Sequence, residues 1–215
     1  MIWGGAKTMI EVKNISLTLN KRQILNNVSL TLKEGNIYGL VGNNGSGKTM
    51  LMKCMCGFIR PTEGTVESNG KVIGRDVDYL PDAGVIIETP GFIPYYSGFQ
   101  NLKVLAGIKN KISAKEIREA IQTVGLDPDL KLPVKKYSLG MRQRLGLAQA
   151  IMENPSVLIL DEPMNGLDKN GVEEIRKLLL FMKDERKIIV IASHNAEDIR
   201  VLCDEVHEME QGELI

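Results

Sequence analysis

The chain has 215 residues, and its 27 basic and 27 acidic side chains cancel to a formal net charge of zero at pH 7. This length fits one domain, or one domain with a sizeable insertion, and a composition of 43% hydrophobic and 25% charged residues argues against a disordered chain, a collagen-like repeat and a disulfide scaffold. The balanced charge gives no support for binding to nucleic acid or anionic lipid through bulk electrostatics.

The N-terminal part of the sequence predicts a group of antiparallel strands. Hydrophobic residues alternate with polar ones over residues 10–19 and again over residues 28–32, and a period of two is typical of strands with one buried face. Residues 1–8 lack the charged start and long apolar middle of a secretory signal peptide, and Met9 is an alternative start of the chain. Nowhere does the sequence approach the ~18 to 20 consecutive apolar residues of a membrane-spanning helix. We therefore expect a protein of cytosolic character.

Further along, buried strands alternate with helices. Nearly all-apolar runs at residues 37–41, 157–160 and 188–192 predict strands that are buried on both faces. A helix is expected over residues 49–55, and hydrophobic residues recur at helical spacing over residues 172–182. Buried strands that alternate with amphipathic helices indicate an α/β fold with a parallel sheet and crossover helices.

The middle of the chain has a different pattern. It contains no run typical of a buried strand, but Ser113 and Glu116 form the capping box of a helix. We predict a mainly helical subdomain over residues 93–154. It is inserted into an α/β core that comprises residues 9–92 and 155–215.

A glycine-rich segment after the first buried strand matches the phosphate-binding loop G-x-x-x-x-G-K-[ST]. Its residues are Gly42, Asn43, Asn44, Gly45, Ser46, Gly47, Lys48 and Thr49. Glycines let the backbone curl so that successive N–H groups point at phosphate oxygens, and the following helix presents its positive N-terminal end. The position between a buried strand and a helix counts against a chance glycine-rich turn. We expect Lys48 to reach the outer phosphates of a nucleotide and the Thr49 hydroxyl to bind Mg²⁺.

Two carboxylates and a histidine follow other buried strands. Asp161 and Glu162 end one strand, at the edge where parallel α/β sheets bind ligands. We expect Asp161 to hold Mg²⁺, directly or through water, and Glu162 to orient the attacking water. His194, after the strand at residues 188–192, is expected to touch the γ-phosphate. Each residue alone would be an ordinary acidic turn or loop histidine, but together with Lys48 they predict a catalytic site for nucleotide hydrolysis.

The segment from Tyr137 to Arg144 resembles the signature of the ATP-binding subunits of ABC transporters, which is usually written L-S-G-G-Q and is followed by a helix. Ser138 is a good N-cap for that helix, so its hydroxyl and the nearby N–H groups offer a second anion site. The resemblance covers nearly the whole chain from Met9. It implies a P-loop nucleotidase core with an antiparallel β subdomain and an inserted helical subdomain.

The same resemblance implies how such a protein assembles. Two subunits, either identical or related, close head to tail over two ATP molecules, so that Ser138 and Gly140 of one subunit face Lys48 of the other. Residues 165–168, which end in Asp168, are similar to the D-loop that lines this interface. The family's transport function also implies a separate transmembrane permease as a partner, whereas no nucleic acid is expected.

The chain departs from the family's pattern at the signature, at the adenine position and at the Q-loop. In the signature, Tyr137 replaces leucine and Met141 stands where glutamine is common. Leu139 stands where glycine is usual, and its bulk beside the phosphate site is expected to weaken hydrolysis. Leu19 matches the aromatic residue that stacks on adenine, and the loss of stacking predicts binding weaker by roughly 1–3 kcal/mol, with a displaced alignment as the alternative. Glu88 replaces the Q-loop glutamine. Because a carboxylate ~4 Å from the γ-phosphate would be repelled by about 4 kcal/mol at an effective dielectric constant near 20, we expect Glu88 to act through Mg²⁺ and its waters.

Residues 86–92 and 192–195 are similar to segments of bacterial ATPases for antimicrobial-peptide export, of the bacitracin-resistance and lantibiotic-immunity type. The hypothesis is an ATP-hydrolysing subunit on the inner face of the cell membrane that powers export through a separate permease. One alternative is a soluble ABC-type ATPase that acts on nucleic acid or ribosomes. Another is a nucleotide-binding regulatory module whose hydrolysis has decayed. The sequence leaves the transported substrate open, because the membrane partner selects it.

Overall fold

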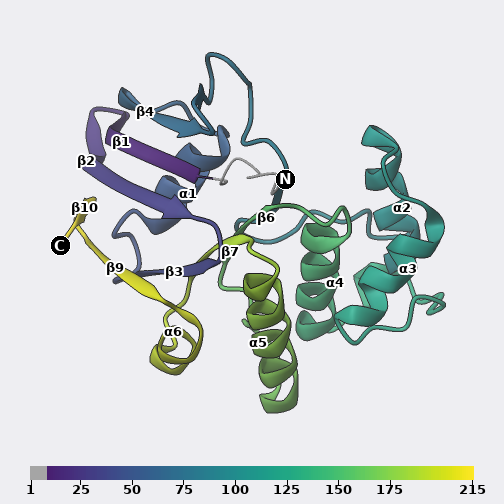
Figure 1. Cartoon of the computed structure of the whole chain (residues 1–215). Coiled ribbons are helices and arrows are strands. Elements are labelled where there is room, and N and C mark those ends of the chain that lie inside the picture. The colour runs from purple at the N-terminus through teal and green to yellow at the C-terminus, as the bar shows by residue number, and fades with distance from the viewer. Residues whose placement is uncertain (1–8) are drawn as a thin grey trace, which may run out of the picture.

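A computed structural model describes residues 9–215, so the expectation about a signal peptide in residues 1–8 lies outside the described part of the chain. The described elements are β1 (Met9–Leu19), β2 (Arg22–Lys33), β3 (Asn36–Val41), α1 (Lys48–Cys56), β4 (Glu63–Ser68), β5 (Lys71–Val72), β6 (Ala83–Ile86), α2 (Gly98–Lys109), α3 (Ala114–Thr123), a 3₁₀ turn η1 (Val134–Lys136), α4 (Leu139–Ile151), β7 (Val157–Asp161), α5 (Lys169–Asp184), β8 (Ile188–Ala192), α6 (Ala196–Leu202), β9 (Glu205–Glu210) and β10 (Glu213–Leu214). Figure 1 shows the strands gathered on one side of the molecule and α2, α3 and α4 on the other.

Two sheets form the strand-rich part. The first is antiparallel, with the order β2-β1-β4-β5, and the second has the order β10-β9-β3-β8-β7-β6 with parallel pairs from β9 to β6. The antiparallel start of the chain and the parallel sheet with crossover helices are therefore confirmed. The sequence did not predict β4, β5, β6, β9 or β10. The reason is plain for β9, where only Met209 of the six residues is buried and no apolar run exists.

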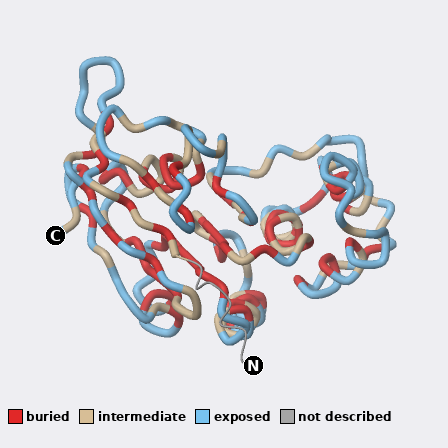
Figure 2. The backbone as a smooth tube through the Cα atoms, turned by 45° about the horizontal axis from the view of Figure 1, so that its top comes forward, coloured by how far each residue is buried: buried red, intermediate tan, exposed pale blue. Residues whose placement is uncertain are grey.

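The central strands separate two hydrophobic clusters. Successive side chains of a strand point to opposite faces of the sheet. Leu158 and Leu160 thus join the cluster formed with α4, α5 and α6, whereas Val157 and Ile159 join the cluster beneath β1, β2 and α1. Figure 2 shows burial concentrated along these strands and exposed backbone in the outer loops. Loops that leave these strands are consequently anchored on a rigid base.

The segment between β6 and β7 is helical, as predicted. At the start of α3, Ser113 N donates to Glu116 Oε2 at 2.7 Å and Glu116 N donates to Ser113 Oγ at 3.5 Å, which is the expected capping box. An equivalent box of Ser97 and Gln100 begins α2. The sequence analysis missed helix α2, although the pattern S-x-x-Q is typical of a capping box at a helix start.

The division into a core of residues 9–92 and 155–215 and a helical subdomain of residues 93–154 stays a prediction. Within residues 9–215, no helix combines the length and the apolar character that crossing a membrane requires.

Gly84 on β6 permits the close approach of α4 to the sheet. A Cβ at this position would collide with the carbonyl oxygen of Ala150 and lie 2.8 Å from Leu158 Cδ2. We expect Gly84→Ala to lower the free energy of unfolding by about 1–3 kcal/mol, because strand and helix must separate. Urea unfolding followed by circular dichroism measures this. The control is Gly107→Ala on α2, where an added Cβ meets no atom within 4 Å. An equal loss in both variants would contradict the packing explanation.

Candidate functional site

The phosphate-binding loop lies between β3 and α1. Helix α1 begins directly after Gly47, whose φ of 113° is a left-handed conformation that favours glycine. A Cβ at Gly47 would lie 2.9 Å from Leu25 Cδ2, and one at Gly42 would collide with the carbonyl oxygen of Met209. The absence of side chains therefore lets the loop lead into the helix N-terminus, where unpaired N–H groups favour an anion.

Lys48 is folded back onto this loop. Its Nζ donates to the carbonyl oxygens of Gly42 at 2.6 Å and Asn43 at 3.1 Å. Asn43 and Asn44 are exposed, whereas Ser46 is buried. The ammonium thus lies at the loop itself, and its contact with the outer phosphates stays a prediction.

Thr49 and Asp161 bring oxygen ligands together. The Thr49 hydroxyl, in the first turn of α1, donates to Asp161 Oδ2 at the end of β7 at 2.8 Å. Hydroxyl and carboxylate oxygens are the ligands that Mg²⁺ prefers, so these two residues fit the ion that was predicted for them. Among residues 9–215, no group of three or more His, Cys, Asp or Glu side chains is arranged to hold a metal ion by itself.

Glu162 and His194 form a pair across the ends of β7 and β8. His194 Nδ1 lies 2.9 Å from Glu162 Oε2, and His194 N donates to Glu162 Oε1 at 3.1 Å. Glu162 has a φ of 50°, which residues other than glycine rarely adopt. Its N–H donates to Ala192 O at 2.9 Å, and Gln143 of α4 donates to the carbonyl oxygens of Glu162 and Pro163 at 3.0 and 3.1 Å. These bonds hold the backbone in that conformation and aim the carboxylate at the histidine.

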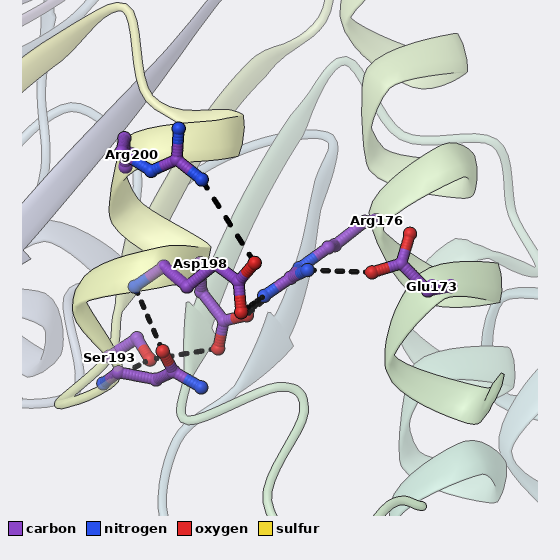
Figure 3. Close-up of polar contacts among 7 residues, drawn as sticks. Glu173, Arg176, Ser193, Asp198 and Arg200 are labelled. Atoms are coloured by element: carbon purple, nitrogen blue, oxygen red, sulfur yellow. Dashed lines mark hydrogen bonds and ion pairs between the residues drawn. The ribbon is translucent and has the colours of Figure 1, made fainter. Parts of the chain in front are cut away.

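A buried ion pair supports the loop that carries His194 (Figure 3). Arg176 of α5 donates from Nε and Nη2 to Asp198 Oδ1 at 3.0 and 2.6 Å. The Ser193 hydroxyl donates to Asp198 Oδ2 at 3.3 Å, and Asn195 N donates to Ser193 Oγ at 3.1 Å. Because Ser193 and Asn195 flank His194, this network fixes the loop on both sides of the histidine. The sequence analysis missed the network, since an arginine in an otherwise amphipathic helix does not reveal its partner.

The phosphate-binding loop, Asp161 and Glu162 border one cleft of about 600 Å³, a volume within the size range of ligand pockets, whereas His194 does not belong to its lining. The predicted site residues in its wall are Asn44, Gly45, Gly47, Lys48, Thr49, Glu88, Asp161 and Glu162. Arg22, Ile24, Arg142 and Gln143 also line it and were not predicted to do so. The last two belong to the recognised signature segment, whereas no local pattern marks Arg22 and Ile24 on β2.

Of the two residues expected at the nucleobase and at the Q-loop position, Glu88 lines the cleft and Leu19 does not. Leu19 ends β1 opposite Arg22, and among the described residues Arg22 and Ile24 rather than Leu19 form this part of the cleft wall. Glu88 lies in the wall, where its Oε1 is 2.6 Å from Lys53 Nζ. The stacking position of Leu19 and the action of Glu88 through Mg²⁺ stay predictions.

The signature segment contacts the D-loop of its own chain. A Cβ at Gly166 would lie 2.6 Å from both Cγ and Cδ2 of Leu139, and a Cβ at Gly140 would lie 2.8 Å from the Gly166 carbonyl oxygen. Leu139 therefore covers Gly166, and it also lines the cleft while remaining 59% exposed. The extra bulk of this leucine is thus in contact with the D-loop of the same subunit.

Two helix caps flank this contact. The Ser138 hydroxyl accepts from Met141 N at 3.1 Å, which confirms its role as the N-cap of α4. Asp168 Oδ1 accepts from Gly171 N at 2.8 Å and caps α5 in the same way. Contacts of Ser138, Gly140 and Asp168 with a nucleotide on another subunit stay predictions.

Comparison with known proteins gives consistent matches. The sequence model of the family described as ABC transporter matches residues 25–165. The ABC transporter ATP-binding protein YybJ of Bacillus subtilis is 45% identical over 206 residues, which are 96% of this chain and 94% of that protein. The bacitracin transport ATP-binding protein BcrA of Enterococcus faecalis is 40% identical, over 96% of this chain and 68% of its own. The lantibiotic transport ATP-binding protein SrtF of Streptococcus pyogenes is 37% identical, over 96% and 89%.

Solved structures agree on the fold. The dimeric structure of MJ0796, a bacterial ABC transporter cassette, has a TM-score of 0.85 and 23% sequence identity, over 95% of this chain and 96% of that chain. At this identity the likeness concerns the fold alone. It confirms the predicted class, an α/β P-loop core with an antiparallel β subdomain and an inserted helical segment.

Proposed function

The chain belongs to the ABC transporter family as an ATP-binding subunit, and from this premise we propose that it powers the export of an antimicrobial peptide or a similar amphipathic compound through a separate membrane subunit. ATP hydrolysis is the activity of this family. The exported compound, the direction of transport, the membrane partner and the cellular location belong to the proposal.

One observation carries the ATPase assignment for this chain. A single cleft holds the phosphate-binding loop, the Thr49–Asp161 oxygen pair and the carboxylate of Glu162, which is bonded to His194. A regulatory module with decayed hydrolysis would have no need for the carboxylate–histidine pair. Glu162 and His194 are in hydrogen-bonding distance here, which supports a working hydrolase.

The residues at the cleft have separate roles in phosphoryl transfer. Lys48 exchanges its loop carbonyls for phosphate oxygens, and Thr49 and Asp161 would hold Mg²⁺, which would supply positive charge to stabilise the developing negative charge. Glu162 orients the attacking water and accepts its proton at a carboxylate oxygen. His194 keeps that carboxylate in place through its backbone N–H and its Nδ1, and its contact with the γ-phosphate stays a prediction.

We infer further that two subunits close over the nucleotides, with a second copy or a related chain as the partner. Ser138 and Leu139 at the start of α4 and Asn165 and Gly166 in the D-loop are exposed. They lie beside the cleft, so a partner surface that carries a phosphate loop can reach them. The related cassette MJ0796 is described as dimeric.

The export of peptides is proposed from the relatives. BcrA and SrtF are named as bacitracin and lantibiotic transport proteins, and each aligns with nearly the whole of this chain. We place the chain on the cytoplasmic face of the membrane, where ATP is available, attached through its membrane subunit. No nucleic acid is part of the proposed assembly.

The proposal is tested by purification from detergent-solubilised membranes, followed by a resistance assay. We expect a multi-span membrane protein to co-purify, and we expect co-expression of both chains to raise the inhibitory concentration of bacitracin or of a lantibiotic. In the same cells Glu162→Gln should give no resistance. Co-purification of RNA without a membrane protein would contradict a role in transport and favour the alternative of a soluble ATPase.

A further inference from the structure

Glu88 is held at the cleft wall by a lysine from another element. It follows β6, and its Oε1 lies 2.6 Å from Nζ of Lys53 in the last turn of α1. Glu88 has a φ of 61°, a backbone conformation that a glutamate rarely adopts. Backbone and ion pair together therefore fix where this carboxylate lies.

The position of the Glu88 carboxylate affects the charge balance of the cleft. The charged side chains that line it are Arg22, Lys48, Arg142, Glu88, Asp161 and Glu162. The three positive and three negative side chains cancel. The lining therefore has no net positive charge to balance the several negative charges on the phosphates of ATP. Lys53 does not belong to the lining, but it forms an ion pair with Glu88, so its positive charge neutralises one of the three carboxylates.

We propose that Lys53 is a positioning residue for nucleotide binding: its ammonium neutralises Glu88 and fixes the position of that carboxylate at the cleft wall, so that its charge repels the phosphates of ATP less. This inference rests on the proposed function, since it presupposes that the cleft binds ATP. It assigns a role to a residue that neither the phosphate loop nor the signature includes.

The physical reason is the difference between a free charge and a close ion pair. A free carboxylate repels phosphate over a long distance in a partly desolvated cleft, whereas the field of a paired carboxylate falls off faster because the ammonium opposes it. Without Lys53, the Glu88 side chain is also free to rotate toward the phosphates. Repulsion should be strongest for ATP without a metal ion, because Mg²⁺ screens the phosphates.

The pair is well suited to mutation, because it lies near the surface. The side chain of Glu88 is 64% exposed and that of Lys53 is 22% exposed, and ion pairs of this kind contribute little to stability. Variants should therefore fold normally, and an unchanged thermal unfolding midpoint verifies this.

The experiment measures ATP affinity by titration calorimetry in EDTA and in Mg²⁺, for the wild type, Lys53→Met, Glu88→Gln and the double variant. We expect Lys53→Met to weaken ATP binding about tenfold in EDTA and less in Mg²⁺. In the Glu88→Gln background, the same lysine change should weaken binding less than about threefold, because no carboxylate is left to position. Lys103→Met, at an exposed site on α2, is the control for loss of a positive charge and should leave the affinity unchanged.

Two results would overturn the inference while leaving the proposed function intact. Equal affinity of Lys53→Met and wild type would show that the ion pair has no influence on the nucleotide. An equal loss in both Glu88 backgrounds would show that Lys53 acts through its own charge and not through Glu88. If the wild type bound no ATP in Mg²⁺, the proposed function itself would fall.

Discussion

Replacing Glu162 by glutamine should slow ATP hydrolysis by about 10²–10⁴-fold and leave ATP binding intact. The amide has nearly the same shape as the carboxylate but cannot accept the proton of the attacking water. The contacts of Lys48 with the phosphate loop and of Thr49 with Asp161 do not involve the Glu162 side chain and should persist. Phosphate release gives the rate and titration calorimetry gives the affinity. Glu119→Gln, on the exposed side of α3, removes the same charge away from the cleft and should turn over normally.

The same variant also tests closure of two subunits, because ATP that is bound but not hydrolysed should hold the closed state. Light scattering on a size-exclusion column, with ATP and Mg²⁺ and then with neither, compares the two states. A dimer that forms only with nucleotide would show that the signature functions although Leu139 covers Gly166. A variant that binds ATP but stays monomeric would contradict closure between identical chains. It would direct attention to a related subunit or to the membrane partner.

The second large effect concerns stability. Arg176→Leu should lower the free energy of unfolding by about 3–5 kcal/mol, because Asp198 is left buried without its counter-charge. The exposed fractions of the two side chains are 7% and 3%, so little water reaches the orphaned carboxylate. Urea unfolding without nucleotide measures the loss. Since the total stability of a domain is about 5–15 kcal/mol, this single change removes a large part of it.

A second substitution separates loss of pairing from loss of packing. The double variant Arg176→Leu, Asp198→Leu should regain most of the lost stability, because an apolar pair can replace a buried ion pair at little cost. Arg75→Met breaks the exposed pair with Asp76 and should leave the unfolding midpoint unchanged. If the double variant were less stable than Arg176→Leu, the uncompensated carboxylate would not be the cause of the loss.

Short-range patterns were sufficient to predict much of the protein. A few consecutive residues are enough to identify the phosphate loop between a buried strand and a helix. The same is true of the carboxylates at the end of β7 and of the cap of α4 at Ser138. Side-chain alternation identified β1 and β2, and helical spacing identified α5, because burial of one face imposes a period on the sequence. Continuous apolar runs identified β3, β7 and β8, because these strands are buried on both faces. Elements such as β9 and β10 were missed because they bury too few residues to produce such a period.

The sequence by itself thus determined the fold class and the family, and it predicted which residues meet the nucleotide. Only the tertiary structure decided that Glu162 bonds His194, that Lys53 holds Glu88, that Leu139 covers Gly166 and that Arg176 supports the histidine loop through Asp198. Each of these contacts joins segments that are separated along the chain. Their distances depend on how strands order in the sheet and how helices pack on it, and no local spacing of residues encodes those distances.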